Sequence, residues 1–205
     1  DVTARRGLGV ATQPYTRFGL GWHDFDHDGA LDIFVANGNV VLEGGTYDQE
    51  NVLLRGTPSG RFEEVLPRGG VASPLRATSR GAAFGDLDDD GDLDIVVVNR
   101  DGPAHVLIHT APKQGHWILA AVVDEHGAPA IGARVKIETP GGPIHRDVQT
   151  GYSYLAANDP RIHAGLGAVD RIEVEVTWRD GLTESFGSFD VDQVIELRRG
   201  SGRAP

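Results

Sequence analysis

Two acidic segments share one pattern of carboxylates around a glycine, and these carboxylates are the residues of the chain with the clearest chemistry. They read DFDHDGALD from Asp24 and DLDDDGDLD from Asp86, and together they hold ten of the chain's 30 acidic residues. Four or more carboxylates in one loop repel one another unless a cation compensates them. The doubled pattern therefore predicts two cation-binding loops.

The spacing of the carboxylates favours calcium. Side-chain oxygens at positions 1, 3 and 5, a turning glycine at 6, a backbone carbonyl at 7 and a carboxylate at 9 suit a hard cation that accepts about six to eight oxygens. The predicted ligands of the first site are Asp24, Asp26, Asp28, the carbonyl of Ala30, and Asp32. Those of the second are Asp86, Asp88, Asp90, the carbonyl of Asp92, and Asp94. Magnesium, which usually keeps several waters, is the alternative.

The loops are not EF-hands. An EF-hand needs a glutamate at position 12 of the loop and a helix after it. Val35 and Val97 stand at that position, and both lie in β-branched segments typical of strands. The loops must therefore be held between strands.

The first half of the chain is an internal repeat. A shift of about 62 residues places Gly19 on Gly81, Asp24 on Asp86 and Asn37 on Asn99, and repeats of this length indicate stacked supersecondary units. Turn residues separate short apolar runs, which predict strands. The expected strands are Phe18–His23, Ile33–Ala36, Val52–Arg55 and Arg61–Val65 in the first unit, and Gly81–Gly85, Ile95–Val98 and Val106–His109 in the second. Four antiparallel strands per unit is the content of one propeller blade.

The periodicity stops after Pro112, so the rest of the chain is expected to be a separate small β domain over residues 113–200. Its predicted strands are Trp117–Val123, Ala133–Glu138, Arg171–Trp178 and Val194–Leu197. The repeats are expected at about 1–62 and 63–112, and the closing residues 201–205 as a disordered tail. The fold class is therefore all-β, with two blades followed by a β-sandwich-like domain.

Composition limits the function classes. The 205 residues carry a formal charge of -11, with no cysteine and no methionine, and no basic stripe offers a footprint for nucleic acid. No apolar run approaches the length of a membrane span. The absence of methionine suggests a processed or incomplete chain, whose targeting segment would lie outside it. Weak calcium sites are typical of extracellular modules, so we expect an extracellular, periplasmic or cell-surface location.

The motifs also carry a family resemblance. With DFDHDGALDIFVANG, DLDDDGDLDIVVVNR, NVLL and GRFEEV, residues 1–112 resemble FG-GAP/VCBS repeats, the blades of integrin-like β-propellers. IGARV, SYLAANDPRIHAGLG and WRDG resemble the ASPIC/UnbV domain, in an arrangement similar to the cartilage acidic protein family and its bacterial relatives. Arg179 and the HGAPA stretch depart from the usual proline and Asn-rich segment of that domain.

The resemblance implies a ring with more blades than this chain supplies. Relatives carry enough repeats to close seven blades, whereas two blades alone would expose sheet edges and an apolar flank, which proteins avoid. We therefore expect the missing blades to come from upstream sequence or from a partner chain. The ligand of such a module would be a protein or a glycan.

Three functions remain open at this point. The first is a calcium-stabilised binding and assembly module, and the second is a secreted enzyme or natural-product pathway component, because propellers host many chemistries. The third is a subunit of an extracellular polymer whose blades complete each other between chains. The enzymatic candidates are weak: His105 and His109 lack a third ligand, and Ser153, Asp159 and His163 have triad residue types without a nucleophile elbow. Trp117 and Trp178 are expected in the core or at a domain interface.

Overall fold

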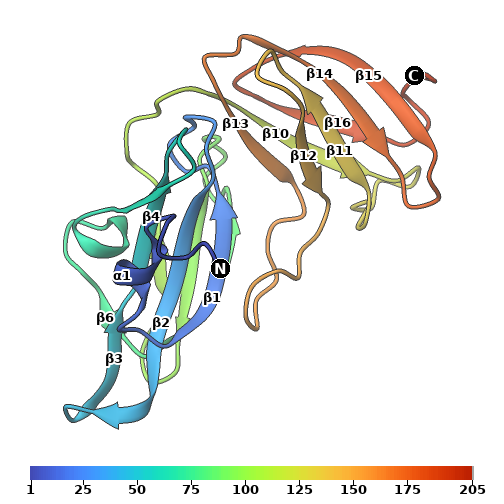
Figure 1. Cartoon of the computed structure of the whole chain (residues 1–205). Coiled ribbons are helices and arrows are strands. Elements are labelled where there is room, and N and C mark those ends of the chain that lie inside the picture. The colour runs from blue at the N-terminus through green and yellow to red at the C-terminus, as the bar shows by residue number, and fades with distance from the viewer. Residues whose placement is uncertain (205) are drawn as a thin grey trace.

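The structure, a computed structural model, describes residues 1–204, which form two β-rich lobes (Figure 1). The helical elements are short: α1 covers Leu8–Thr12 and the 3-10 turn η1 covers Arg68–Gly70. Within residues 1–204, no helix has the length and apolarity needed to cross a bilayer. The chain is therefore built almost wholly from strands and turns, as the sequence predicts.

The first repeat forms a four-stranded antiparallel sheet, blade one. Its strands run in chain order across the sheet: β1 (Arg17–His23), β2 (Asp32–Glu43), β4 (Val52–Gly56) and β5 (Phe62–Glu64). All four lie where the apolar runs predict them. The second half of β2 extends beyond the blade and pairs with β3 (Thr46–Glu50), which pairs in turn with β6 (Arg76–Ala77).

The second repeat forms blade two, a sheet of three strands. They are β7 (Ser79–Gly85), β8 (Asp94–Asn99) and β9 (His105–Leu107), all antiparallel. They also match the predicted positions. The chain then leaves the blade through residues 110–115, the linker, and enters the second lobe.

The blades pack face to face through an apolar cluster. Its members from blade one and loop one are Phe25, Phe34 and Ala36, and from blade two Ala82, Phe84, Leu93, Ile95 and Val97. Gly21 lets the sheets approach closely, because a Cβ there would lie 2.5 Å from the Phe84 ring. Full burial of a large apolar side chain contributes about 1.5–3 kcal/mol. This contact therefore fixes the positions of the two acidic loops relative to one another.

The faces of the two blades that point away from each other differ in what packs against them. The outer face of blade one, with Ile33, Val35, Val52 and Leu54, packs against Leu8, Ala11 and Tyr15 of the N-terminal segment. The face of blade two that points away from blade one, the open face, presents Val98, Val106 and Ile108, which are 53%, 57% and 44% exposed. By the repeat, Val98 corresponds to the fully buried Ala36. The open face is therefore a blade surface without a neighbouring blade among residues 1–204.

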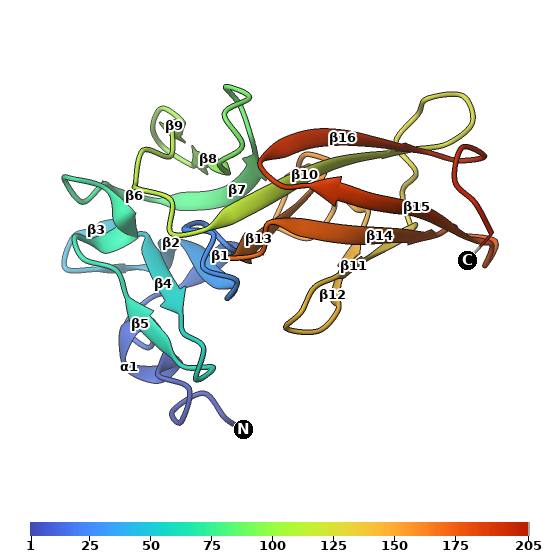
Figure 2. The same ribbon diagram turned by 90° about the horizontal axis from the view of Figure 1, so that it is seen from above.

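The second lobe is a sandwich of two sheets (Figure 2). One sheet has the order β13 (Ile162–Gly167), β10 (His116–Val123), β16 (Gln193–Arg198), and the other β12 (Ile144–Asp147), β11 (Arg134–Glu138), β14 (Arg171–Thr177), β15 (Thr183–Asp190). Side chains from both sheets, including Ile118, Val135, Val174 and Leu197, form one buried core. The predicted sandwich is confirmed.

The C-terminal residues are more ordered than expected. Instead of a disordered tail at 201–205, Arg203 exchanges backbone hydrogen bonds of 2.9 and 2.8 Å with Ser185 of β15. Pro205 lies outside the described residues. The segment around Arg203 is therefore held by backbone pairing with β15, which the composition of the segment does not indicate.

A long connection between β12 and β13 reaches back from the sandwich to the blades (Figure 1). The Phe84 backbone N–H donates to the Asn158 side-chain oxygen at 3.0 Å, and the Asp159 N–H donates to the Phe84 carbonyl at 3.0 Å. The Phe18 and Tyr154 rings meet edge to face, with centroids 5.1 Å apart. This connection therefore anchors the second lobe on β1 and β7, beside the acidic loops.

Candidate metal centre

Loop one (24–32) and loop two (86–94) fold in the same way. His27 and Asp89, at the same position in each loop, have φ of 63° and 59°, and Gly29 and Gly91 both have φ of 90°. The first aspartate of each loop accepts two backbone N–H groups: Asp24 from Asp28 and Gly29, and Asp86 from Asp90 and Gly91, at 2.8–3.2 Å. In both loops the backbone thus turns around the carboxylate of the first aspartate and donates hydrogen bonds to it.

The last aspartate of each loop ties the loop to the blade. One Asp32 oxygen accepts the Phe25 N–H at 2.9 Å and the other accepts the Gly56 N–H of β4 at 2.7 Å. Asp94 does the same with Leu87 and His109, each at 2.8 Å. Both carboxylates are buried, at 3% and 2% exposure. Their first structural role is therefore to close the loop onto the third strand of its blade.

The structure brings together three carboxylates of each predicted site. Ligand oxygens of Asp24, Asp26 and Asp28 lie within 4.8 Å of one another in loop one, as do those of Asp86, Asp88 and Asp94 in loop two. Asp32 and Asp90 lie outside these triplets, and one Asp90 oxygen accepts the Asp92 N–H at 2.9 Å. All-oxygen donor sets of this kind suit calcium or magnesium.

The electrostatics of the loops would favour a bound cation. Burial, reinforced by neighbouring aspartates, raises the pKa of Asp24 to about 7, and burial raises that of Asp32 to about 6. The pKa values of Asp26, Asp86 and Asp88 are raised as well, with loss of hydration as the largest cause. A bound divalent cation would favour the charged form of each carboxylate and remove this cost.

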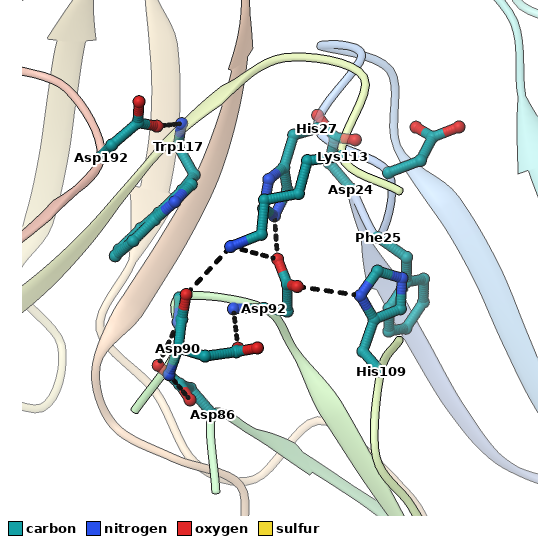
Figure 3. Close-up of polar contacts among 12 residues, drawn as sticks. Asp24, Phe25, His27, Asp86, Asp90, Asp92, His109, Lys113, Trp117 and Asp192 are labelled. Carbon is teal, nitrogen blue, oxygen red and sulfur yellow. Dashed lines mark hydrogen bonds and ion pairs between the residues drawn. The ribbon is translucent and has the colours of Figure 1, made fainter. Parts of the chain in front are cut away.

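Asp92 does more than the sequence suggests. Its carboxylate is 3% exposed and meets three cationic or titratable groups: His27 at 3.4 Å, His109 at 3.2 Å and Lys113 at 3.2 Å (Figure 3). The sequence pattern predicts a role only for its carbonyl. Loop one has Ala30 at the same position, so the extra acid in loop two was the available signal.

The linker binds both loops at once. The Lys113 ammonium donates to the Asp90 carbonyl at 2.9 Å and lies 5.5 Å from the centroid of the Trp117 ring (Figure 3). The next residue, Gln114, donates its backbone N–H to the Asp26 carbonyl at 2.7 Å and its side-chain amide to the Asp26 carboxylate at 2.6 Å. Two consecutive linker residues therefore form hydrogen bonds with both loops, so the position of the linker depends on the conformation of each loop.

The second lobe touches the loops directly. The Gly167 N–H donates to the His27 carbonyl at 3.0 Å, and the Arg161 guanidinium donates to the Asp86 carbonyl at 2.9 Å. Two close approaches need glycine: a Cβ on Gly165 would overlap the Asp24 carboxylate, and a Cβ on Gly91 would overlap the Trp117 ring. The two acidic loops are therefore the surface on which the second lobe docks.

The enzymatic candidates do not come together among residues 1–204. His105 lies 3.4 Å from the Asn99 amide, whereas His109 faces Asp92. The Asp159 carboxylate is paired with the Arg161 guanidinium, and none of the described hydrogen bonds joins it to Ser153 or His163. Trp117 lies at the contact with loop two, and Trp178 lies in the sandwich core, where its indole N–H donates to Glu184 at 2.8 Å.

Acid is expected to weaken the contact between the lobes through His163. This residue is 8% exposed, its ring centroid lies 5.0 Å from that of His27, and burial lowers its pKa well below the ordinary value, with His27, His23 and Arg146 adding to the effect. Because the unfolded chain takes up the proton first, stability falls as the pH drops below about 6.5. For one such group the loss is at most about 1.4 kcal/mol per pH unit.

The measurement is urea unfolding at each pH in saturating calcium, with His163→Gln as the control. The raised pKa of Asp24 acts in the opposite direction in metal-free protein, so the calcium-loaded comparison is needed. Stability of wild type should fall more steeply with acid than that of the variant. Parallel pH profiles for the two proteins would show that His163 does not contribute.

Comparisons with known proteins agree with this architecture. Residues 24–97 match the FG-GAP-like repeat, and residues 124–204 match the family described as ASPIC and UnbV. Cartilage acidic protein 1 of Xenopus tropicalis is 30% identical over 180 residues, which cover 85% of this chain and 27% of the relative. The proteins of that name from Mus musculus and Homo sapiens are each 30% identical over 181 residues, with the same shares.

The chain spans about a quarter of the length of these relatives. Its two matched regions fall on the two lobes of the structure, with the blades first and the sandwich second. The combination is that of an extracellular-type module.

Proposed function

Because the chain joins FG-GAP-like repeats to an ASPIC and UnbV domain, we propose that it is a calcium-stabilised binding and assembly module of an extracellular or cell-surface protein. The observation that carries the proposal is the equivalence of the two loops, each with three convergent carboxylates and the same backbone conformation. Calcium would act structurally, by neutralising these carboxylates. It would also hold the surface on which the second lobe docks.

The contacts of the linker and the second lobe support this structural role. Asp26 accepts the Gln114 amide, and the Asp86 carbonyl accepts the Arg161 guanidinium. A loop that loses its cation keeps its carboxylate repulsion, so the positions of these acceptors are less well defined. Calcium at the loops would therefore stabilise the blades and their contact with the sandwich together.

Calcium is expected to raise the melting temperature of the protein. Sites with Kd of about 10⁻⁴–10⁻³ M contribute roughly 1.4–2.7 kcal/mol each at about 10 mM calcium. Two such sites correspond to a rise of about 5–20 °C over protein in a chelator. The measurement is thermal unfolding followed by circular dichroism, with magnesium at the same concentration as the control. A calcium effect no larger than that of magnesium would contradict the proposal.

The partner most strongly favoured is the rest of a propeller. The open face of blade two carries Val98, Val106 and Ile108 where blade one has contacts with its neighbour. An apolar patch of this kind marks an interaction site. We propose that a further blade of the longer protein covers it. A blade from another chain, as in a polymer, is the second candidate, and a molecular mass that rises with concentration in light scattering would favour it.

A further inference from the structure

A cavity lies between the two lobes. It is bounded by β1 and loop one on the blade side, and by β12, β13 and the connection between them on the sandwich side. Its volume is about 400 Å³, within the range of about 300–1,000 Å³ that is usual for small-molecule sites. Four of the 13 lining residues are apolar and nine carry polar side chains. Sites for apolar ligands are lined predominantly by hydrophobic side chains, so this lining suits a polar ligand.

The acidic side chains that line the cavity are already paired with arginines. The Asp159 carboxylate pairs with the Arg161 guanidinium at 2.6 Å, and the Asp147 carboxylate pairs with the Arg134 guanidinium of the neighbouring strand β11 at 2.8 Å. Arg146 of β12 also lines the cavity, and no carboxylate among the described side chains lies within ion-pair distance of it. One positive charge of the cavity is therefore left without a counter-charge.

The Arg146 guanidinium is held in place by backbone groups. Its Nε and Nη1 atoms donate to the His163 and His145 carbonyls at 3.3 and 3.0 Å, whereas its Nη2 atom has no acceptor among the described residues. Burial lowers the pKa of Arg146, and the Asp24 carboxylate, which lies beyond ion-pair distance, offsets only part of this. A carboxylate bound at Nη2 would replace the lost hydration with charge-assisted hydrogen bonds.

The blade side of the cavity offers an aromatic face and hydrogen-bonding groups. Trp22 is 51% exposed, and its ring meets the Phe62 ring edge to face at 5.9 Å. The Tyr152 hydroxyl forms a hydrogen bond of 3.2 Å with His23 Nε2. Burial, followed by the charge of Arg146, lowers the pKa of His23 to about 4, so this imidazole is neutral at pH 7. The hydroxyl keeps capacity for a further hydrogen bond with a ligand.

We propose that this cavity binds a sugar acid, with the carboxylate on the Arg146 guanidinium and the saturated ring against the exposed face of Trp22. A sugar ring presents C–H groups on its face and hydroxyl groups at its edge, which match an exposed indole and a polar lining. A wholly apolar acid would leave the polar lining groups without partners. None of the predicted metal ligands lines the cavity. The inference names a ligand for the proposed binding module and rests on that proposal.

Ligand-detected NMR titration of the wild-type chain in saturating calcium tests the proposal. Methyl glucuronide is expected to bind with a Kd of about 1 mM, the order expected for a ligand of its size. Methyl glucoside lacks the carboxylate and acetate lacks the ring, so each should bind at least about 10-fold more weakly. Equal affinity for glucuronide and glucoside, or for glucuronide and acetate, would overturn the proposal.

Arg146→Gln tests the position of the carboxylate. The variant should bind methyl glucuronide at least about 10-fold more weakly than wild type and should not change the binding of methyl glucoside. Arg171→Gln is the matched control, because it makes the same charge change in β14, away from the cavity lining. Unchanged glucuronide binding in Arg146→Gln, as coordination of the ligand to loop calcium would give, would overturn the proposal.

Tryptophan fluorescence tests the position of the ring and uses no variant of Arg146. Of the three tryptophans, Trp22 is exposed, whereas Trp117 and Trp178 are 8% and 3% exposed. Methyl glucuronide should change the emission of wild type and leave that of Trp22→Leu unchanged. The same change in both proteins would place the ligand elsewhere and overturn the proposal. Calcium titration of the same preparation keeps the two proposals apart, since two calcium sites without glucuronide binding would contradict this inference alone.

Discussion

Gly91→Ala is expected to destabilise the protein far more than Gly29→Ala. The two glycines occupy the same place in loop two and loop one, and both have φ of 90°, so an alanine costs each loop about 1–2 kcal/mol of backbone strain. Their surroundings differ. A Cβ on Gly91 would overlap the Trp117 ring, whereas a Cβ on Gly29 would approach no atom closer than the Gly167 nitrogen at 4.0 Å. Overpacking adds about 1–3 kcal/mol at Gly91 alone.

The loss of unfolding free energy in Gly91→Ala beyond that in Gly29→Ala measures the contact between the second lobe and loop two. It is obtained from urea unfolding of both variants in saturating calcium. In a Trp117→Leu background the difference between the two alanine variants should shrink, because the obstructing ring is gone. Equal costs for Gly91→Ala and Gly29→Ala in the wild-type background would mean that Trp117 does not hold the loop in solution.

Asp94→Ala is expected to destabilise the protein even without metal. Its two oxygens accept the Leu87 and His109 N–H groups at 2.8 Å, and the side chain is 2% exposed. Removing it leaves two backbone donors without a partner, at a cost of about 1–3 kcal/mol each. The measurement is the free energy of unfolding in a calcium chelator, where no ligand role can contribute.

Asp88→Ala is the matched control, because it lies in the same loop and is exposed. Its oxygens converge with those of Asp86 and Asp94, so it can serve as a ligand without closing the loop. In chelator this variant should unfold like wild type, whereas in calcium it should lose the contribution of loop two. Equal losses of unfolding free energy for Asp88→Ala and Asp94→Ala in chelator would contradict this distinction, in which Asp88 serves as a metal ligand and Asp94 holds the loop closed through hydrogen bonds.

The repeated elements could be predicted from the sequence because local pattern and tertiary environment agree there. Ile33–Ala36 and Ile95–Val98 are β-branched or apolar runs bounded by acidic turns, and both form the second strand of a blade. The paired Asp–Gly loops likewise specify their own conformation, with the same φ values in both copies. Two copies with the same spacing made the local signal unambiguous.

The contacts between the lobes could not be predicted from the sequence, because they join residues far apart in the chain. Nothing in the sequence around Lys113 indicates that its ammonium contacts Asp90 and Asp92. The sequence pattern predicts a role for Asp92 only through its carbonyl, although its carboxylate meets His27 and His109. The strands β12, β13 and β15 were missed for the same reason, since their pairing partners in the sandwich define them more than their own composition does.

Calorimetric titration of metal-free protein with calcium tests the central claim most directly. Two sites are expected in the 1–205 chain, with Kd of about 10⁻⁴–10⁻³ M. Asp26→Ala should abolish the site in loop one, and Asp88→Ala the site in loop two, so that each variant retains one site. A stoichiometry below two in the wild-type chain, or two sites remaining in either variant, would contradict the assignment of the acidic loops as calcium sites.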